Sequence, residues 1–348
     1  MLLEGLFLPL TTPFYPDGRL NLRKLEHNVD RASKTPVAGL VVLSEPGEAA
    51  MLSDEETKEA LSAAIAVAVE TKVMLAGVSR SSVVATLELA DVAAGLGYDA
   101  VLVKRPSILT AEAASETLTY FRTVADRAAA PVVLYSTKCG PLAVELVAEL
   151  AGHPQVLGLM DEAADASRVA AIVKATSGVK REVTVTHVFT AVTGRMQVAK
   201  AEAGAATFVS AETLTEGRAA VAVAPPKPAI KTRSKTVGFQ VLAANTAAML
   251  AGLKAGASGV MPAFAAAAPQ ACYEVYAAWK DGDLPLAEEK QQHLAAAVAG
   301  IEEALGVPGI RYASDLNGYF GGAPRLPLLP LTGAERQAVE RLMGGIRN

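Results

Sequence analysis

The stretch Val156-Leu157-Gly158-Leu159-Met160-Asp161-Glu162 is a short apolar run that ends in two acidic residues. His153-Pro154 precedes it and Ala163 follows it. A run of four to eight apolar residues between turn signals is typical of a parallel strand that is buried on both faces. The stretch therefore predicts a buried strand of an α/β barrel. Met160 is expected at its carboxyl end, where the active sites of such barrels lie.

Similar apolar runs alternate with amphipathic stretches of helical length on the N-terminal side of this strand, which is the pattern of βα units. The predicted strands are Gly5–Leu10, Gly39–Leu43, Val73–Ala76, Ala100–Val103, Val132–Tyr135 and Val156–Met160. The predicted helices are Asn21–Lys34, one opened by the capping box of Ser53 and Glu56, Ser81–Leu96, Thr110–Ala128, Leu142–Ala151 and Ala166–Thr176. Six such units in about half of the chain predict an α/β fold of the (β/α)8 TIM-barrel type.

Two more barrel strands are expected after an irregular stretch. Gly238–Leu242 and Gly259–Met261 are the predicted strands seven and eight, so residues 184–236 are a predicted insertion before the last two strands. The barrel is expected over residues 1–268. The chain from residue 269 to residue 348 has helical patterns and is expected to form a C-terminal helical domain.

The predicted insertion is heterogeneous. A strand-like run, Val183–His187, is followed by Ala-rich runs at 199–204 and 206–209 and by a Pro-rich basic stretch that begins at Ala224. Residues 200–209 weakly resemble residues 254–261. Partial copies of one βαβ element and chance similarity of Ala-rich sequence both explain that likeness, and the sequence leaves the two open.

Composition excludes several classes of protein. The 348 residues are 51% hydrophobic with a net charge of −4. That composition buries a large core and gives no reason to expect nucleic acid or a membrane surface as a partner. Cys139 and Cys272 lack metal-ligand spacing, so we expect no disulfide framework and a cytoplasmic location. The apolar N-terminus has no basic segment, and the Ala-rich runs are too short to span a bilayer, so neither a signal peptide nor a membrane span is expected.

Five stretches in order carry a resemblance to a known family. They are Thr12-Pro13-Phe14 with Asp17-Gly18, then residues 47–56, 132–135, 255–261 and 324–331. Together they resemble the dihydrodipicolinate synthase / N-acetylneuraminate lyase family of class I pyruvate aldolases, over nearly the whole chain apart from the insertion. The resemblance implies a lyase for a small oxo acid or sugar acid that needs no cofactor. It also implies a barrel with a C-terminal helical domain and a homo-oligomer, a dimer or a tetramer.

The resemblance also implies which positions carry the chemistry, and here the chain departs from the family. The family forms a Schiff base between pyruvate and a lysine at the end of strand six, but Met160 stands at that position. Its Thr-Thr turn after strand two corresponds to Glu45-Pro46, and proline has no N–H to donate to a substrate carboxylate. The loop 136–140 is shorter than in the family and lacks its arginine. Of the reacting set only Tyr135 remains, as a candidate proton relay.

Other side chains at the expected mouth of the barrel are candidates for binding substrate. Lys104 and Lys138 follow strands four and five, and each is either a relocated Schiff-base lysine or a lysine that binds a carboxylate. Met160 is expected to fill the emptied lysine site by packing, because methionine adapts to irregular gaps. The predicted substrate-binding residues are Thr12, Ser44, Glu45, Gly47, Lys104 and Lys138.

Carboxylates near the ends of strands two and six leave a further alternative. Glu45, Glu48, Asp161 and Glu162, together with His187, offer an oxygen-rich set that could hold a divalent cation, with Glu45, Asp161 and His187 as its candidate ligands. The other interpretation is that Glu48 and Glu162 cap or pair within the scaffold. Arg325 is expected to hold the C-terminal region on the barrel.

Three hypotheses follow from the sequence. The first is a diverged lyase or aldolase that acts on an oxo acid without the imine. The second is a catalytically silent barrel that binds a ligand or a partner. The third is a metal-dependent aldolase or hydratase on the same barrel.

Overall fold

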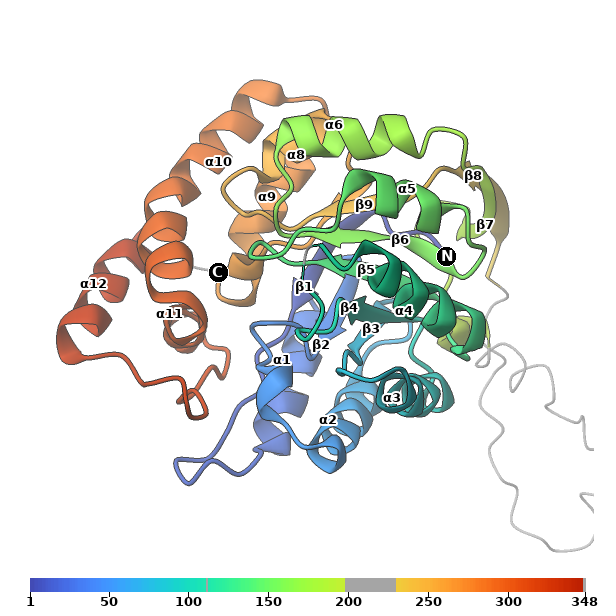
Figure 1. Ribbon diagram of the computed structural model, residues 1–348. Helices are drawn as coiled ribbons and strands as arrows, with labels where there is room; N and C mark the ends of the chain where they lie inside the picture. The colour runs from blue at the N-terminus through green and yellow to red at the C-terminus, as the bar shows by residue number, and fades with distance from the viewer. Residues whose placement is uncertain (111, 198–229, 347–348) are drawn as a thin grey trace, which may run out of the picture.

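The computed structural model describes residues 1–110, 112–197 and 230–346. Eight parallel strands close into a barrel in the order β1-β10-β9-β6-β5-β4-β3-β2 (Figure 1). The strands are β1 Gly5–Pro9, β2 Gly39–Val42, β3 Val73–Gly77, β4 Ala100–Lys104, β5 Val132–Ser136, β6 Val156–Asp161, β9 Gln240–Ala243 and β10 Gly259–Val260. This confirms the predicted barrel, and β9 and β10 are the predicted strands seven and eight.

Helices connect the strands and surround the barrel (Figure 1). They are α1 Leu22–Ser33, α2 Asp54–Val67, α3 Val83–Leu96, α4 Ala114–Arg127, α5 Val144–Ala151, α6 Ala166–Ala175 and α8 Met249–Lys254. Local sequence sets several of their starts. Ser53 and Glu56 form the predicted capping box of α2, and Asn21 caps α1 through its side chain.

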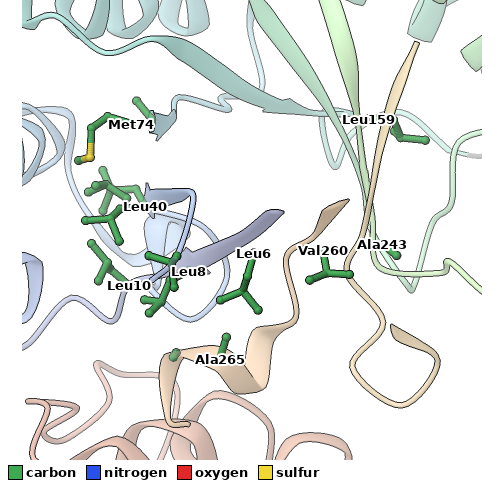
Figure 2. Packing of buried hydrophobic residues seen from close by; sticks show 14 of the residues in the cluster. Leu6, Leu8, Leu10, Leu40, Met74, Leu159, Ala243, Val260 and Ala265 are labelled. Carbon is green, nitrogen blue, oxygen red and sulfur yellow. The ribbon is translucent and has the colours of Figure 1, made fainter. Parts of the chain in front are cut away.

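Alternation along each strand divides the core into two layers. Outward side chains such as Leu6 and Leu8 of β1 pack in a cluster between strands and helices, which Figure 2 shows with Ala265 of η3 (Ala263–Ala266) close by. Inward side chains such as Phe7 form a second cluster inside the barrel. The side-chain period of two places alternate residues on opposite faces, so position along a strand decides which layer a residue joins.

The described part of the predicted insertion forms a hairpin outside the barrel. β7 (Arg181–Thr186) pairs antiparallel with β8 (Thr232–Val237), so the predicted strand Val183–His187 exists but does not join the barrel. The Arg181 guanidinium donates to the carbonyl oxygen of Val156, at the start of β6, at 2.6 Å. The hairpin therefore lies at the amino ends of the barrel strands. The Ala-rich runs predicted at 199–204 and 206–209 lie outside the described residues.

The C-terminal region is helical. It comprises α9 Pro269–Lys280, α10 Leu284–Ala297, the π-helical η4 Val298–Glu303, α11 Ala304–Leu316 and α12 Gly333–Met343. α10, α11 and α12 lie on one side of the barrel, away from the hairpin (left in Figure 1). Arg325 joins this region to the barrel, with its guanidinium on both oxygens of Glu56 at 2.6 and 2.7 Å and on the Met51 carbonyl at 2.8 Å. The predicted role of Arg325 is confirmed. Among the described residues no helix is long and apolar enough to cross a membrane.

Candidate active site

A cavity of about 800 Å³ opens at the carboxyl ends of the barrel strands, where β/α barrels place their active sites. Residues after β2, β4, β5, β6 and β9 line it, and η4 and the start of α11 form its far wall. The polar residues that reach it from the barrel include Ser44, Glu45, Lys104, Tyr135, Lys138 and Glu162.

Met160 points into the barrel but does not line this cavity. Its side chain is 3% exposed and packs in the inner cluster with Tyr135 and Leu242, its neighbours in register on β5 and β9. The next residue of β6, Asp161, points outward to Arg168 of α6. The residue after that, Glu162, turns inward again, so the first polar side chain above Met160 on this face is a carboxyl.

Tyr135 brings three functional groups together. Its hydroxyl donates to Glu162 Oε1 in a short hydrogen bond and lies 3.3 Å from Glu45 Oε2. Burial, followed by the negative charges of Glu162 and Glu45, raises the pKa of the Tyr135 phenol well above its usual value. The phenol therefore stays protonated over the physiological pH range and acts as a hydrogen-bond donor.

Glu162 has an unusual environment for a carboxylate. Burial and then the charge of Glu45 raise its pKa to about 7, although hydrogen bonds from Tyr135 and from the Lys138 amide favour its ionised form. The Lys138 amide donates to Glu162 Oε2 at 3.0 Å. A carboxyl with a pKa near neutrality gives and takes protons under working conditions, which suits general acid–base chemistry.

Hydrogen bonds of Arg168 and of the backbone hold the segment that carries Glu162 in place. The Arg168 guanidinium pairs with Asp161 at 2.6 Å and donates to the Leu142 carbonyl at 2.7 Å, and so ties the end of β6 to the chain after β5. The Glu162 amide donates to the Ser136 carbonyl at 3.0 Å. Together these bonds hold the Tyr135 and Glu162 side chains at a fixed separation.

The chain makes a tight turn at the end of β2 that places Ser44 beside the cavity. Leu43 has a φ of 63°, and its carbonyl oxygen lies so close to Gly77 that a Cβ there would stand 1.9 Å from it. The turn places Ser44 on the cavity wall, 2% exposed. Within the described residues its hydroxyl has no hydrogen-bond partner. A buried hydroxyl of this kind is available to a ligand.

The two predicted lysines reach the same cavity. Lys104, at the end of β4, is in register with Tyr135, and its backbone amide donates to the Ser79 hydroxyl oxygen at 2.9 Å. Lys138 is exposed, and its Nζ lies 3.5 Å from Glu303 on the far wall. The cavity that Tyr135 lines thus has two lysine side chains on its wall.

A sequence comparison now places the chain in a family. The model of the dihydrodipicolinate synthetase family matches residues 2–221 and 227–345. The chain belongs to the dihydrodipicolinate synthetase family. This confirms the family that the resemblance indicated.

Named relatives agree with this family. A 4-hydroxy-tetrahydrodipicolinate synthase of Xanthomonas axonopodis pv. citri (strain 306) is 38% identical over 177 residues, which are 50% of this chain and 58% of that relative. The chain thus matches little more than half the length of that relative. An L-threo-3-deoxy-hexylosonate aldolase of Hypocrea jecorina is 25% identical over 99% of this chain and 95% of its own.

Solved structures show the same fold. A prophage protein of the dihydrodipicolinic acid synthase family from E. coli K12, crystallised in complex with pyruvate, is 22% identical. It superposes with a TM-score of 0.77 over 99% of both chains. A dihydrodipicolinate synthetase-like protein from Pseudomonas aeruginosa, 22% identical, gives a TM-score of 0.75 over 99% of this chain and 100% of that chain.

Within this family fold, two predicted binding residues lie outside the cavity lining. Thr12 is 1% exposed, and in the described part of the chain its hydroxyl has no hydrogen-bond partner. Gly47 closes a turn onto the Ser44 carbonyl, and a Cβ there would meet the Leu10 carbonyl oxygen at 3.0 Å. Close packing explains this glycine. The structure therefore brings together Ser44, Glu45, Lys104, Tyr135 and Lys138, but not Thr12 or Gly47.

The structure does not bring together the ligands of the alternative metal site. Glu45 lies at the cavity, Asp161 is fully buried against Arg168, and His187 is exposed at the end of β7, at the opposite end of the barrel. Among the described residues no three His, Cys, Asp or Glu side chains gather as metal ligands. Side chains alternate between the two faces of a strand, so Asp161 points outward to Arg168, away from Glu45.

Two carboxyls of the cavity were missed or misread from sequence. The sequence left Glu162 open between a metal site and a pair within the scaffold. Glu48 forms such a pair with Arg311 at 3.0 Å, but Glu162 contacts Tyr135. Counting alternate residues from Met160 is the signal that could have found it. Glu302 comes from the π-helical turn η4, for which the sequence offers no pattern.

Replacing Glu302 with glutamine is expected to stabilise the protein above pH 7 and to have little effect near pH 4. Burial raises the pKa of Glu302 to about 7, despite a 2.7 Å hydrogen bond from Thr246. Between the unfolded pKa and this value the native state binds more protons than the unfolded state, so stability falls as pH rises. The fall is at most about 3 kcal/mol, and glutamine removes it.

Urea unfolding of both proteins at pH 4 and pH 8 measures this effect. Glutamine keeps an acceptor for Thr246, so the comparison isolates the charge. Equal differences in unfolding free energy at the two pH values would contradict the raised pKa.

Proposed function

We propose that the chain is an aldolase-type lyase of small oxo acids that works without an imine between enzyme and substrate. The observation that carries this proposal is Met160, because a thioether cannot form an imine and here it packs inside the barrel where the resemblance expects an amine. The pyruvate bound to the solved relative from E. coli and the aldolase activity of the relative from Hypocrea jecorina support an oxo acid or sugar acid as the substrate class.

Without an imine, the negative charge that develops on the substrate carbonyl oxygen must be stabilised by hydrogen bonds. The protonated phenol of Tyr135 is suited to donate one. Lys104 or Lys138, with the Ser44 hydroxyl, is suited to hold the substrate carboxylate. In this arrangement the electron-withdrawing group is the carbonyl oxygen itself.

Turnover and binding measured on one panel of compounds test this function. The panel contains 4-hydroxy-2-oxo acids, 3-deoxy sugar acids and their pyruvate product, with proton NMR to follow cleavage and calorimetry to follow binding. Cleavage of a panel member is the expected result. Binding without any cleavage would instead support the silent ligand-binding barrel. We also propose a homodimer or homotetramer, which light scattering of the purified protein tests.

A further inference from the structure

We infer that Glu162 is the catalytic acid–base residue of this site, in contact with the Tyr135 hydroxyl and close to Glu45. The inference deepens the proposed function and rests on it. It assigns the proton transfers that the phenol cannot perform, because a phenol that stays protonated donates a hydrogen bond but does not serve as a base.

The Glu45 carboxyl, the Tyr135 hydroxyl and the Glu162 carboxyl form a cluster, and each comes from a different strand. Glu45 follows β2, Tyr135 belongs to β5 and Glu162 follows β6, and all three line one cavity. The phenol has a single proton and donates it to Glu162, while the Glu45 carboxyl lies 3.3 Å from the same oxygen. The negative charge of Glu45 beside the buried Glu162 favours the protonated form of Glu162.

The contacts of Glu162 are those of a reacting group, not of a scaffold residue. Its carboxyl accepts from the Tyr135 hydroxyl and the Lys138 amide, and it also interacts with the Glu45 carboxyl. The adjacent Asp161 shows the contrast, because it is fully buried and neutralised by Arg168 at 2.6 Å. The scaffold thus already has its ion pair at the end of β6, and Glu162 remains turned toward the cavity.

The charges around Glu162 favour its protonated form. The other charged groups that line the same cavity are Glu45, Glu48, Lys104, Lys138, Glu302 and Glu303. The carboxyls outnumber the amines, and the Lys138 amine lies 3.5 Å from Glu303. A carboxyl in such surroundings holds its proton to higher pH than one in water, and a base of this strength is effective near neutrality.

For a 4-hydroxy-2-oxo acid the step balances as follows. The Glu162 carboxylate takes the proton of the C4 hydroxyl, the C3–C4 bond breaks, and its electron pair forms the C2–C3 double bond of an enolate. The negative charge on the C2 oxygen accepts the hydrogen bond of Tyr135, and the aldehyde leaves. Protonated Glu162 then returns its proton to C3, which regenerates the carboxylate and releases the 2-oxo acid. No oxidant or reductant is needed.

Exchange of the C3 protons tests the last step without knowledge of the full substrate. Pyruvate, 2-oxobutanoate and 2-oxoglutarate are incubated with the protein in D2O, and proton NMR follows loss of the C3 signal. The wild type is expected to exchange at least one probe, with a rate that rises with pH up to about 7 and then levels, because the carboxylate is the active form. Glu162→Gln is expected to lower the rate about 10²–10⁴-fold and to remove this limb of the pH profile.

Two further variants guard against a merely structural effect. Glu162→Asp keeps a carboxyl and is expected to retain a pH-dependent limb at reduced rate. Glu149→Gln makes the same change at an exposed pair with Arg122, away from the cavity, and is expected to leave exchange unchanged. Circular dichroism verifies that each variant is folded.

The outcomes separate this inference from the proposed function. Exchange by Glu162→Gln at the wild-type rate and with the wild-type pH profile would overturn the role of Glu162 alone. A wild type that exchanges none of the probes would overturn the proposed function, and the inference would fall with it.

Discussion

Replacement of Arg311 by methionine is expected to lower the free energy of unfolding by about 3–5 kcal/mol. The Arg311 side chain is fully buried, 3.0 Å from Glu48, and it also donates to the Ala323 carbonyl at 3.0 Å. Its guanidinium lies over the Phe14 ring at 5.1 Å. Removal of the cation leaves the Glu48 carboxylate buried without its partner, and burial already raises the pKa of Glu48. Chemical unfolding measures the loss.

Two control variants test whether the loss of stability comes from the buried ion pair. Arg122→Met breaks a partly exposed pair with Glu149 and is expected to cost less than about 1 kcal/mol. In the background of Arg311→Met, Glu48→Gln is expected to recover part of the loss, because it removes the unpaired charge. A loss below 1 kcal/mol for Arg311→Met would show that this pair does not join the C-terminal helices to the barrel.

Replacement of Tyr135 by phenylalanine is expected to lower kcat about 10²–10³-fold with little change in KM. The phenol is the hydrogen-bond donor beside Glu162 and Glu45, and its bond to a substrate oxygen strengthens only as negative charge develops there. Rates of C3 proton exchange and of cleavage measure the effect.

Tyr312→Phe is the matched control, because the Tyr312 hydroxyl also bonds a carboxylate, Glu340, at 2.7 Å, but outside the cavity. This variant is expected to keep full activity. Equal activity of Tyr135→Phe and the wild type would remove the phenol from the reaction.

The barrel was predictable because each strand and helix has a recognisable pattern within its own stretch of sequence. Each strand is a continuous apolar run, and polar caps such as Ser53 with Glu56 mark the starts of helices. The strand-like run at Val183 was found too, but the sequence alone did not show that it pairs with Thr232–Val237 outside the barrel, because pairing between distant segments leaves no local pattern.

The candidate site was predictable only in part. Tyr135 and Met160 were located by resemblance, and Lys104 and Lys138 by their places after strands. The role of Glu162 depends on which face of β6 it occupies and on its contact with Tyr135, a residue 27 positions away. Glu302 reaches the cavity because the C-terminal helices pack over the barrel, which no periodicity in the sequence specifies.

Met160 and Glu162 together suggest how one barrel serves a changed chemistry. The strand that supplies the amine in the resemblance supplies here a packed thioether and, two residues later, a carboxyl against Tyr135. In the function proposed here, acid–base catalysis with hydrogen-bond stabilisation of an enolate takes the place of covalent catalysis.

Borohydride trapping tests the central claim most directly. The wild type is incubated with pyruvate and sodium borohydride, and intact-mass spectrometry measures any covalent addition. We expect the unmodified mass, since reduction traps only an imine and Met160 cannot form one. A mass gain of one reduced pyruvyl group, mapped by peptide analysis to Lys104 or Lys138, would contradict the claim and show that another amine has taken over the role.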